Sequence, residues 1–405
     1  MAAAIQLPET HRVLQLESTE EPLQVKTVPT PQPGPGSAVV QVLASAVISY
    51  SGDLYNGKRQ YPFPMPMVPG CTAVGRVVAV GPDATTLTPG TLVLLECTIR
   101  GRDNSSAVML SGIVQGFTEA SANLMHGEWR DSTYAQYCKF PLENCIPLNE
   151  TRLLGEPSAG GLGYRVEDLT HMFRLLVPYG GLDDIGLKPG ETIIVAPATG
   201  QFSSAAVRVA LAMGAGRVIA MGRNEEALKQ LRELDGRVST VKITGDMEAD
   251  AAALRVWGPA DAFFDISPPM AAGSTQFKSG IAALRNGGRI SLMGGLPSDV
   301  SFAYEDFVVW GLSMKGTWMY TREQIAGFLR LAVGATDQGK EDATTDALLD
   351  YMTSEYASQP EEQEPNDEAN QAGQRRRRSW SPGAETFVQR RGLARGAVTI
   401  VEKEE

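Results

Sequence analysis

The stretch TIIVAPATGQFSSAAVRVALAMGA, residues 192–215, decides the fold of this chain of 405 residues. Its β-branched start, from Ile193 to Val195, is typical of a buried parallel strand, and the small residues after it turn into a helix with an apolar face. The N–H groups at the start of such a helix face the turn and attract an anion. The stretch therefore predicts a strand, a turn and a helix that hold the pyrophosphate of a dinucleotide.

The turn departs from G-x-G-x-x-G, the glycine pattern of dinucleotide sites. Gly200 lets the backbone approach a phosphate closely, whereas Ala198 and Ser203 occupy the outer glycine positions. Taken alone, this pattern leaves open an ordinary strand-to-helix turn of an α/β protein. The residues of the turn that we predict to contact the cofactor are Ala198, Thr199, Gly200, Gln201, Phe202 and Ser203.

A second strand is predicted at residues 217–221 and ends in Gly222, Arg223 and Asn224. NAD-binding folds place an acidic residue for the ribose 2′-hydroxyl about 20 residues beyond the glycine turn, and this chain has no acid there. Gly222 leaves room for a 2′-phosphate and Arg223 can pair with it, so the sequence favours NADP(H) over NAD(H). The alternative is that Arg223 is an exposed residue at a helix start. We predict that all three residues contact the cofactor.

The alternation of strands and helices continues beyond this point. Residues 262–266 and 289–293 read as further strands, with a helix at 275–285 that the glycine pair 287–288 is expected to stop. The pattern predicts a doubly wound parallel sheet, in which ligands bind beyond the carboxyl ends of the strands. A second glycine pair follows the last strand, where backbone must pass close to a nicotinamide, although an ordinary turn is the alternative. The residues of this pair are Gly294 and Gly295.

Composition limits the class of protein. The chain is 43% hydrophobic and only 7% aromatic, which suits an α/β enzyme, and its net charge of −11 argues against an extended surface for nucleic acid. No basic segment followed by an apolar run opens the chain, and no apolar stretch approaches membrane-spanning length. Four scattered cysteines are too few for a disulfide framework. We expect a cytoplasmic protein with reduced thiols and without a membrane anchor.

The first 160 residues have a different character. Apolar runs at 38–43, 73–80 and 91–95 are separated by Pro-Gly, Gly-Pro and Asn-Gly signals, which is the pattern of a β-rich barrel. A glycine-rich segment at 155–163 and a helical stretch at 166–177 follow it. The sequence thus predicts a compact β domain ahead of the cofactor domain.

Several segments in this order resemble the medium-chain dehydrogenase/reductase superfamily over roughly residues 10 to 335. They are VPGCTAVGRVVAVGPD (68–83), LTPG (87–90), GEWRDSTYAQYCKFPLEN (127–144), GLKPGETIIVAPATG (186–200) and KGTWMYTREQI (315–325). The resemblance implies a GroES-like β-barrel, a Rossmann doubly wound sheet, and a substrate that enters between the two domains. The boundaries we expect are 1–160 for the GroES-like substrate domain, 161–335 for the Rossmann domain, 336–385 for a polar, disordered insertion, and 386–405 for a C-terminal strand returning to the barrel.

The departures from the family pattern concern its metal. Zinc members resembling this chain carry a Cys three residues before an Asp and then Gly-His-Glu, whereas here Tyr50 precedes Asp53 and the later motif reads Gly-Cys71-Thr72. A catalytic zinc needs about three protein ligands, which these positions do not supply. Asp53-Leu-Tyr55 followed by a Tyr-Pro-x-Pro run is similar to the zinc-free quinone oxidoreductases, and the Gly-Cys pair to trans-acting enoyl reductases of fungi. We therefore expect no metal.

Without a metal, hydrogen-bond donors must stabilise the negative charge that develops on the substrate oxygen. The resemblance places four candidate catalytic residues near it: Tyr55, Tyr50, Thr72 and Cys71. Each has an alternative reading as barrel packing. A loop with Arg100 and Arg102 is a further candidate for the substrate mouth, with contact left open.

Together, the residues and the resemblance predict an NADPH-dependent, zinc-independent oxidoreductase that passes hydride to a conjugated enone, quinone or ketone, with secondary metabolism implied by resemblance alone. The alternatives are a non-catalytic cofactor-binding or scaffold protein of the same fold, and a zinc-type alcohol dehydrogenase. The expected partner is a small-molecule substrate. The arginine run 375–378 is flanked by acidic stretches and reads as a solvated loop, so no nucleic acid is expected. The sequence leaves the oligomeric state open, with a homodimer among the expectations.

Overall fold

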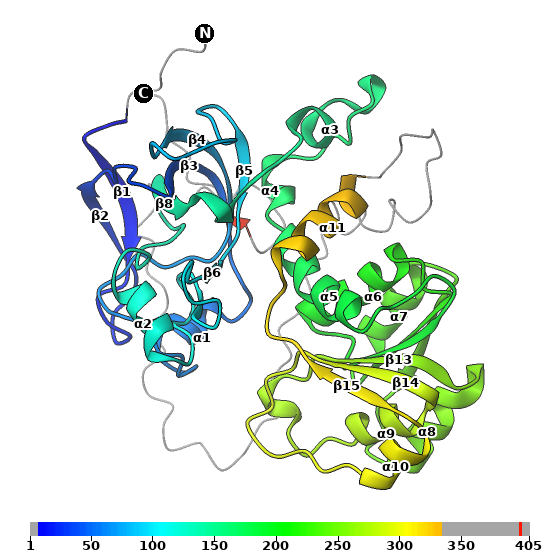
Figure 1. Ribbon diagram of the computed structural model, residues 1–405. Helices are drawn as coiled ribbons and strands as arrows, with labels where there is room; N and C mark the ends of the chain where they lie inside the picture. The colour runs from blue at the N-terminus through cyan, green and yellow to red at the C-terminus, as the bar shows by residue number, and fades with distance from the viewer. Residues whose placement is uncertain (1–6, 334–396, 399–405) are drawn as a thin grey trace. The chain divides into compact units, whose positions relative to one another are not determined.

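The computed structural model describes residues 7–333 and 397–398, which divide into two compact units (Figure 1). The first unit contains residues 7–170 with the short strand at 397–398, and the second contains residues 171–333. The predicted insertion at 336–385 lies outside the described residues, as does most of the predicted segment 386–405. Each unit has its own sheet and its own apolar core.

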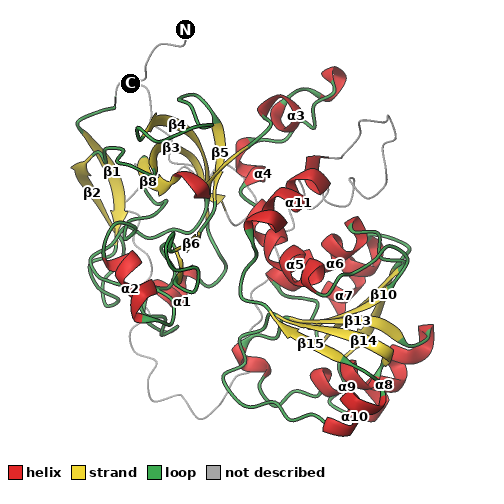
Figure 2. Cartoon of the chain, in the orientation of Figure 1, coloured by secondary structure: helices red, strands yellow, loops and turns green. Residues whose placement is uncertain are grey.

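The first unit is built mostly of antiparallel strands joined by tight turns (Figure 2). Its main sheet follows the order β16 (Ala397–Val398), β3 (Ser37–Ala46), β4 (Ala73–Val80), β5 (Leu92–Leu95) and β9 (Cys145–Pro147), with β8 (Tyr137–Pro141) also pairing with β3. Two smaller sheets are β1 (Thr10–Gln15) with β2 (Gln24–Pro29), and β6 (Thr98–Arg100) with β7 (Val108–Leu110). The strands predicted at 38–43, 73–80 and 91–95 are confirmed.

Strands β3 and β4 are the centre of this unit because they are buried on both faces. Val40 and Val77 pack in one apolar cluster with Leu95 and Phe140. Gly75 has no space for a side chain, since a Cβ there would lie 2.5 Å from the carbonyl oxygen of Gln41. This close approach holds β4 against the middle of β3, and the chain continues beyond the end of β3 into α1 (Ser51–Tyr55). The other helices of the unit are α2 (Glu119–His126), α3 (Glu150–Leu154) and α4 (Val166–Leu169).

The second unit contains the predicted parallel sheet, which is confirmed. Its strand order is β12 (Val238–Lys242), β11 (Arg217–Gly222), β10 (Thr192–Ala196), β13 (Ala260–Asp265), β14 (Leu284–Leu292) and β15 (Ser313–Gly316), and every neighbouring pair is parallel. From β10 the chain moves to β11 on one side, and it returns to β13 on the other. The direction of winding therefore reverses between β10 and β13, where doubly wound sheets bind their ligands.

Helices cover both faces of this sheet. Helices α5 (Met172–Asp184), α6 (Gln201–Ala212) and α11 (Arg322–Val333) lie on one face, and α8 (Met247–Leu254), α9 (Gln276–Ala282) and α10 (Tyr304–Val309) on the other (Figure 1). Helix α7 (Glu225–Glu233) packs against β11 and β12. Ile194, Ile219 and Phe263 form the core between these layers. Within residues 7–333 and 397–398, no helix combines the length and the apolar character needed to cross a membrane.

One predicted boundary in this unit is wrong. The glycine pair 287–288 does not stop a helix, because α9 ends at Ala282 and both glycines lie inside β14. Gly287 has a φ of +72°, and the pairing of β14 with β13 shifts register between Leu284 and Arg289. The two glycines therefore allow the register shift within β14. A glycine pair at such a shift looks the same in sequence as one at the end of a helix.

Candidate functional site

The glycine turn of the second unit lies between β10 and α6. Ile193 and Ile194 are fully buried, and the turn after them is joined to β11 by a hydrogen bond of 2.7 Å from the Ala198 N–H to the Met221 carbonyl. The Ser203 hydroxyl accepts from the Gly200 N–H at 2.9 Å and so caps the start of α6. The first N–H groups of a helix have no partner within the helix and attract negative charge. The turn is thus shaped for a phosphate.

The end of β11 lies directly beside this turn. Gly222 is buried, and a Cβ at that position would lie 2.8 Å from Cγ2 of Thr199, so only glycine fits. Arg223 is exposed. The Asn224 side chain accepts from the Ala227 N–H at 3.0 Å and caps α7. The structure thus brings Thr199 and Gly222 together. The Arg223 side chain lies on the surface, and the Asn224 amide oxygen caps α7.

Two further residues of the predicted turn point in other directions. Phe202 packs edge-to-face against Phe173 of α5, with ring centroids 5.8 Å apart. Gln201 is the first residue of α6 and is partly exposed. The Phe202 side chain therefore fixes the helix, and only the backbone of this residue remains to face a phosphate.

The glycine pair after β14 lies against the end of β13. A Cβ on Gly294 would be 2.8 Å from both the nitrogen and the oxygen of Ser267 and 2.9 Å from Oδ2 of Asp265. A Cβ on Gly295 would meet nothing within 4 Å. Only Gly294 must therefore be glycine, because it lies in close contact with the end of β13. The winding of the sheet reverses between β10 and β13.

Asp265 is a residue of this region that the sequence analysis missed. It is the last residue of β13, is 3% exposed and pairs in register with Ala196 of β10. Burial raises its pKa to about 6, against the lowering effect of hydrogen bonds from Ser267. The signal that could have found it is an acidic residue at the end of the otherwise apolar strand AFFDI, since acids are seldom buried without a role.

In the first unit, the Tyr55 hydroxyl is fully engaged by the backbone. It donates to the Gly112 carbonyl at 3.0 Å and accepts from the Gly70 N–H at 3.2 Å. Gly70 and Gly112 touch each other, because a Cβ on Gly112 would lie 1.7 Å from the Gly70 oxygen. Burial raises the pKa of Tyr55 well above its usual range. The contacts favour a role in holding the chain just before Cys71, and contact with substrate stays a prediction.

Replacing Tyr55 by phenylalanine is expected to lower the free energy of unfolding by about 1–3 kcal/mol, because a buried N–H and a buried carbonyl lose their shared partner. Urea unfolding followed by circular dichroism measures this loss. Tyr61→Phe is the matched control, since Tyr61 is 37% exposed and its variant should unfold within about 0.5 kcal/mol of the parent. Equal midpoints for the two variants would contradict the proposed role of the Tyr55 hydroxyl.

Tyr50 differs from Tyr55 in its surroundings. It is partly exposed, lies at the start of α1, and carries the Arg59 guanidinium 4.0 Å from its ring centroid. Burial raises the pKa of Tyr50, with a further rise from Tyr61 and an opposing effect of Arg59. The phenol therefore stays protonated near neutral pH, in the form that can donate a hydrogen bond.

Cys71 and Thr72 are buried, at 2% and 1% exposed. The Thr72 hydroxyl donates to the Leu95 carbonyl, and the Cys71 thiol lies 4.0 Å from the Ala46 carbonyl oxygen. Burial raises the pKa of the neighbouring Cys97 thiol well above its usual range, with smaller contributions from Glu96 and Cys71. The Cys71 and Thr72 side chains are thus directed at the barrel's own backbone.

The residues of the first unit do not fit a catalytic zinc. Tyr50 and Thr72 stand where the family pattern has a cysteine and a glutamate. In the described part of the chain, no three His, Cys, Asp or Glu side chains come together as they would around a metal ion. Burial raises the pKa of the Cys97 thiol, which makes it a poor ligand, since zinc binds the thiolate. Chemistry through a metal is therefore not assigned to this site.

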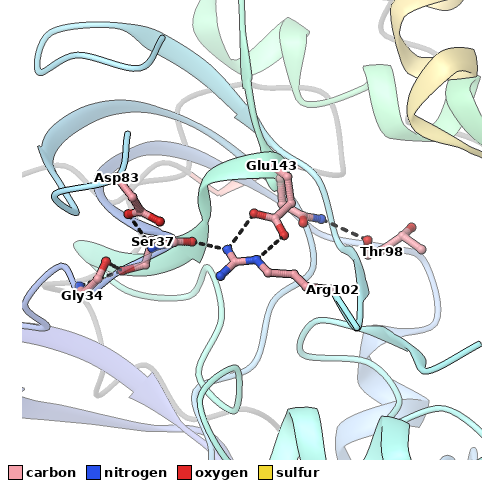
Figure 3. A network of polar contacts seen from close by, with 8 residues as sticks. Gly34, Ser37, Asp83, Thr98, Arg102 and Glu143 are labelled. Carbon is pink, nitrogen blue, oxygen red and sulfur yellow. Dashed lines mark hydrogen bonds and ion pairs between the residues drawn. The ribbon is translucent and has the colours of Figure 1, made fainter. Parts of the chain in front are cut away.

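The loop that carries Arg102 has a structural role (Figure 3). The Arg102 guanidinium forms a two-pronged ion pair with Glu143, at 2.8 and 2.7 Å, and also donates to the Gly36 carbonyl. The Gly36 N–H in turn donates to Asp83 at 2.7 Å. The network ties this loop to the start of β3, so Arg102 has its own partners within the first unit.

Comparison with known proteins agrees with both units. Residues 34–150 match the family model of the alcohol dehydrogenase GroES-like domain, and residues 203–334 match that of the zinc-binding dehydrogenases. L-threonine 3-dehydrogenases of Serratia proteamaculans (strain 568) and Shigella sonnei (strain Ss046) are each 25% identical to this chain over 319 residues, or 77% of this chain and 85% of theirs.

Solved structures agree on the fold. An NAD-dependent alcohol dehydrogenase superposes with a TM-score of 0.61 at 24% identity, covering 80% of this chain and 89% of that one. A protein of Sinorhizobium meliloti 1021, described as a zinc-binding dehydrogenase and bound to NADP, gives 0.62 at 19% identity, covering 81% and 90%. A crotonyl-CoA carboxylase/reductase gives 0.66 at 15% identity, covering 81% and 80%.

The two units are therefore those of a pyridine-nucleotide-dependent oxidoreductase, a GroES-like domain and a doubly wound parallel sheet. The chain belongs to the medium-chain dehydrogenase/reductase superfamily. The predicted family and fold class are confirmed. This family acts on small-molecule substrates.

Proposed function

We propose that this protein is an NADPH-dependent, zinc-independent oxidoreductase that delivers hydride to a conjugated enone, quinone or ketone. The observation that carries the proposal is the meeting of Thr199 with Gly222, beside the exposed Arg223. A phosphate turn next to an acid-free strand end suits the extra phosphate of NADPH. The proposal includes a cytoplasmic location and a small-molecule substrate, with the oligomeric state left open.

Each unit contributes different groups to the proposed reaction. In the second unit, the Ser203-capped start of α6 would hold the pyrophosphate, Arg223 would pair with the 2′-phosphate, and the backbone at Gly294 and Gly295 would lie next to the nicotinamide. NADPH supplies the hydride when it is bound. As negative charge develops on the substrate oxygen, the protonated Tyr50 phenol donates a hydrogen bond to it. Tyr55 and Thr72 hold the barrel backbone through their bonds to Gly70, Gly112 and Leu95.

Titration with NADPH followed by turnover on a panel of enones, quinones and ketones tests the proposal. We expect saturable quenching of protein fluorescence by NADPH, and NADPH oxidation with at least one class of substrate. Metal analysis of the purified protein should find less than stoichiometric zinc, and a chelator should leave the rate unchanged. Binding without turnover on any substrate would favour the non-catalytic alternative. One tightly bound zinc per chain would instead indicate a zinc-type dehydrogenase.

Replacing Arg223 by alanine is expected to raise the KM for NADPH by roughly 10- to 100-fold, because a hydrogen-bonded charge pair with the 2′-phosphate is lost. The KM for NADH should change little, since NADH has no phosphate there. Steady-state kinetics with both cofactors measure the difference. Lys229→Ala is the control, an exposed cation on α7 whose loss should leave both values unchanged. Equal effects of Arg223→Ala on the two cofactors would remove Arg223 from cofactor selection.

A further inference from the structure

Asp265 is the first member of a buried chain of polar side chains. The Ser267 hydroxyl donates to Oδ1 of Asp265 at 2.6 Å, and Gln276 Nε2 of α9 donates to the Ser267 oxygen at 3.1 Å. All three residues are at most 3% exposed. Buried polar side chains need hydrogen-bond partners, and here Ser267 links the Asp265 carboxylate to Gln276, whose Oε1 also accepts from the Ser274 hydroxyl. Losing Asp265 or Ser267 therefore removes a buried partner from the next side chain.

The same residues join the loops that follow β13 and β14. The Met293 N–H donates to the Asp265 carbonyl at 2.9 Å, and the Gly295 N–H donates to the Ser267 carbonyl at 2.9 Å. Between these two bonds, Gly294 lies against Oδ2 of Asp265 and the backbone of Ser267. These bonds link the loop after β13 to the loop after β14, and the Asp265 carboxylate lies between the two loops.

The linked loops after β13 and β14 lie where a parallel sheet of this kind binds its ligand. Asp265 pairs in register with Ala196, immediately before the phosphate turn, at the point where the winding of the sheet reverses. Hydride transfer depends steeply on placement, and a shift of about 1 Å can cost about 100-fold in rate. We propose that Asp265, through Ser267, is a positioning residue that holds the Gly294–Gly295 backbone in the geometry for the nicotinamide. This inference rests on the proposed function.

The test compares Asp265→Ala and Asp265→Asn with the parent protein. The alanine variant loses the acceptor for Ser267, and we expect at least about a tenfold weaker NADPH dissociation constant by fluorescence titration, or an equal loss of kcat. The asparagine variant keeps an oxygen for the Ser267 hydroxyl, so it should recover most of that loss. Ser267→Ala, which removes the link but keeps the carboxylate, should resemble Asp265→Ala.

The control is Asp261→Asn, at the opposite end of the same strand, where the carboxylate accepts from the Thr192 N–H and pairs with Arg285. It should lower the melting temperature and leave the NADPH dissociation constant and kcat unchanged. If Asp265→Ala binds NADPH and turns over like the parent, the inference is wrong while the proposed function stands. If Asp265→Ala and Asp261→Asn lose the same stability and neither changes the NADPH dissociation constant or kcat, the role of Asp265 is structural alone. A parent protein that does not bind NADPH overturns both.

Discussion

Replacing Gly294 by alanine should lower kcat/KM of NADPH-dependent turnover by at least about 100-fold, the cost of misplacing a reacting group by about 1 Å. The added methyl would lie 2.8 Å from the Ser267 backbone and 2.9 Å from Oδ2 of Asp265. Backbone at the end of a buried strand cannot yield cheaply, so Gly294 itself must move. Since the proposal has this backbone border the nicotinamide, the movement displaces the cofactor.

Gly295→Ala is the matched control for this variant, because a Cβ at Gly295 meets no atom within 4 Å. Its φ also lies outside the left-handed region that only glycine tolerates well, since Gly295 is not among the glycines with positive φ. Steady-state kinetics and a melting curve for both variants separate placement from stability. A Gly294→Ala protein with parental kinetics would show that this loop does not border the cofactor.

Replacing Tyr50 by phenylalanine should lower kcat by about 100- to 1000-fold, the usual cost of one donor to a developing oxyanion. The NADPH dissociation constant should stay the same, because Tyr50 is not among the residues that we propose to hold the cofactor. Phenylalanine keeps an aromatic ring for the Arg59 guanidinium, which lies 4.0 Å from the Tyr50 centroid, so the fold should not change.

Single-turnover kinetics with NADPH in excess measure the Tyr50 effect on the chemical step. Tyr61→Phe is the control, because Tyr61 also carries Arg59, with the guanidinium 5.4 Å from its ring, and is assigned no role in catalysis. If the rate of hydride transfer is the same in Tyr50→Phe as in the parent, another group must stabilise the substrate oxygen.

The sequence predicts the fold well because periodicity is a local property. Strands β4 and β10 follow directly from their apolar runs, and the parallel sheet follows from the alternation of strands and helices. The glycine pair 287–288 shows where this reasoning fails. A glycine at the end of a helix and a glycine at a strand irregularity have the same local signature, and only the pairing of β14 with β13 distinguishes them.

The site is less predictable because it depends on contacts between distant residues. Tyr55 and Gly112 are 57 positions apart, and nothing in the sequence around either indicates that the hydroxyl donates to that carbonyl. Asp265 looks like an ordinary strand terminus until β14 and Gly294 are placed against it. Gly222 and Arg223, by contrast, come directly after a strand that the apolar periodicity locates. Their position at the end of that strand can therefore be predicted from the sequence.

The buried carboxylate of Asp265 has a thermodynamic consequence. Its pKa of about 6 in the fold lies above the ordinary value of 3.8, so the folded protein binds this proton more tightly than the unfolded chain does. The carboxylate therefore costs no stability below pH 3.8, an increasing amount as the pH rises to about 6, and a constant amount, on the order of 3 kcal/mol, above that. Near neutral pH the burial of this charge therefore lowers stability, and the proposed positioning role is one for which such a cost would be retained.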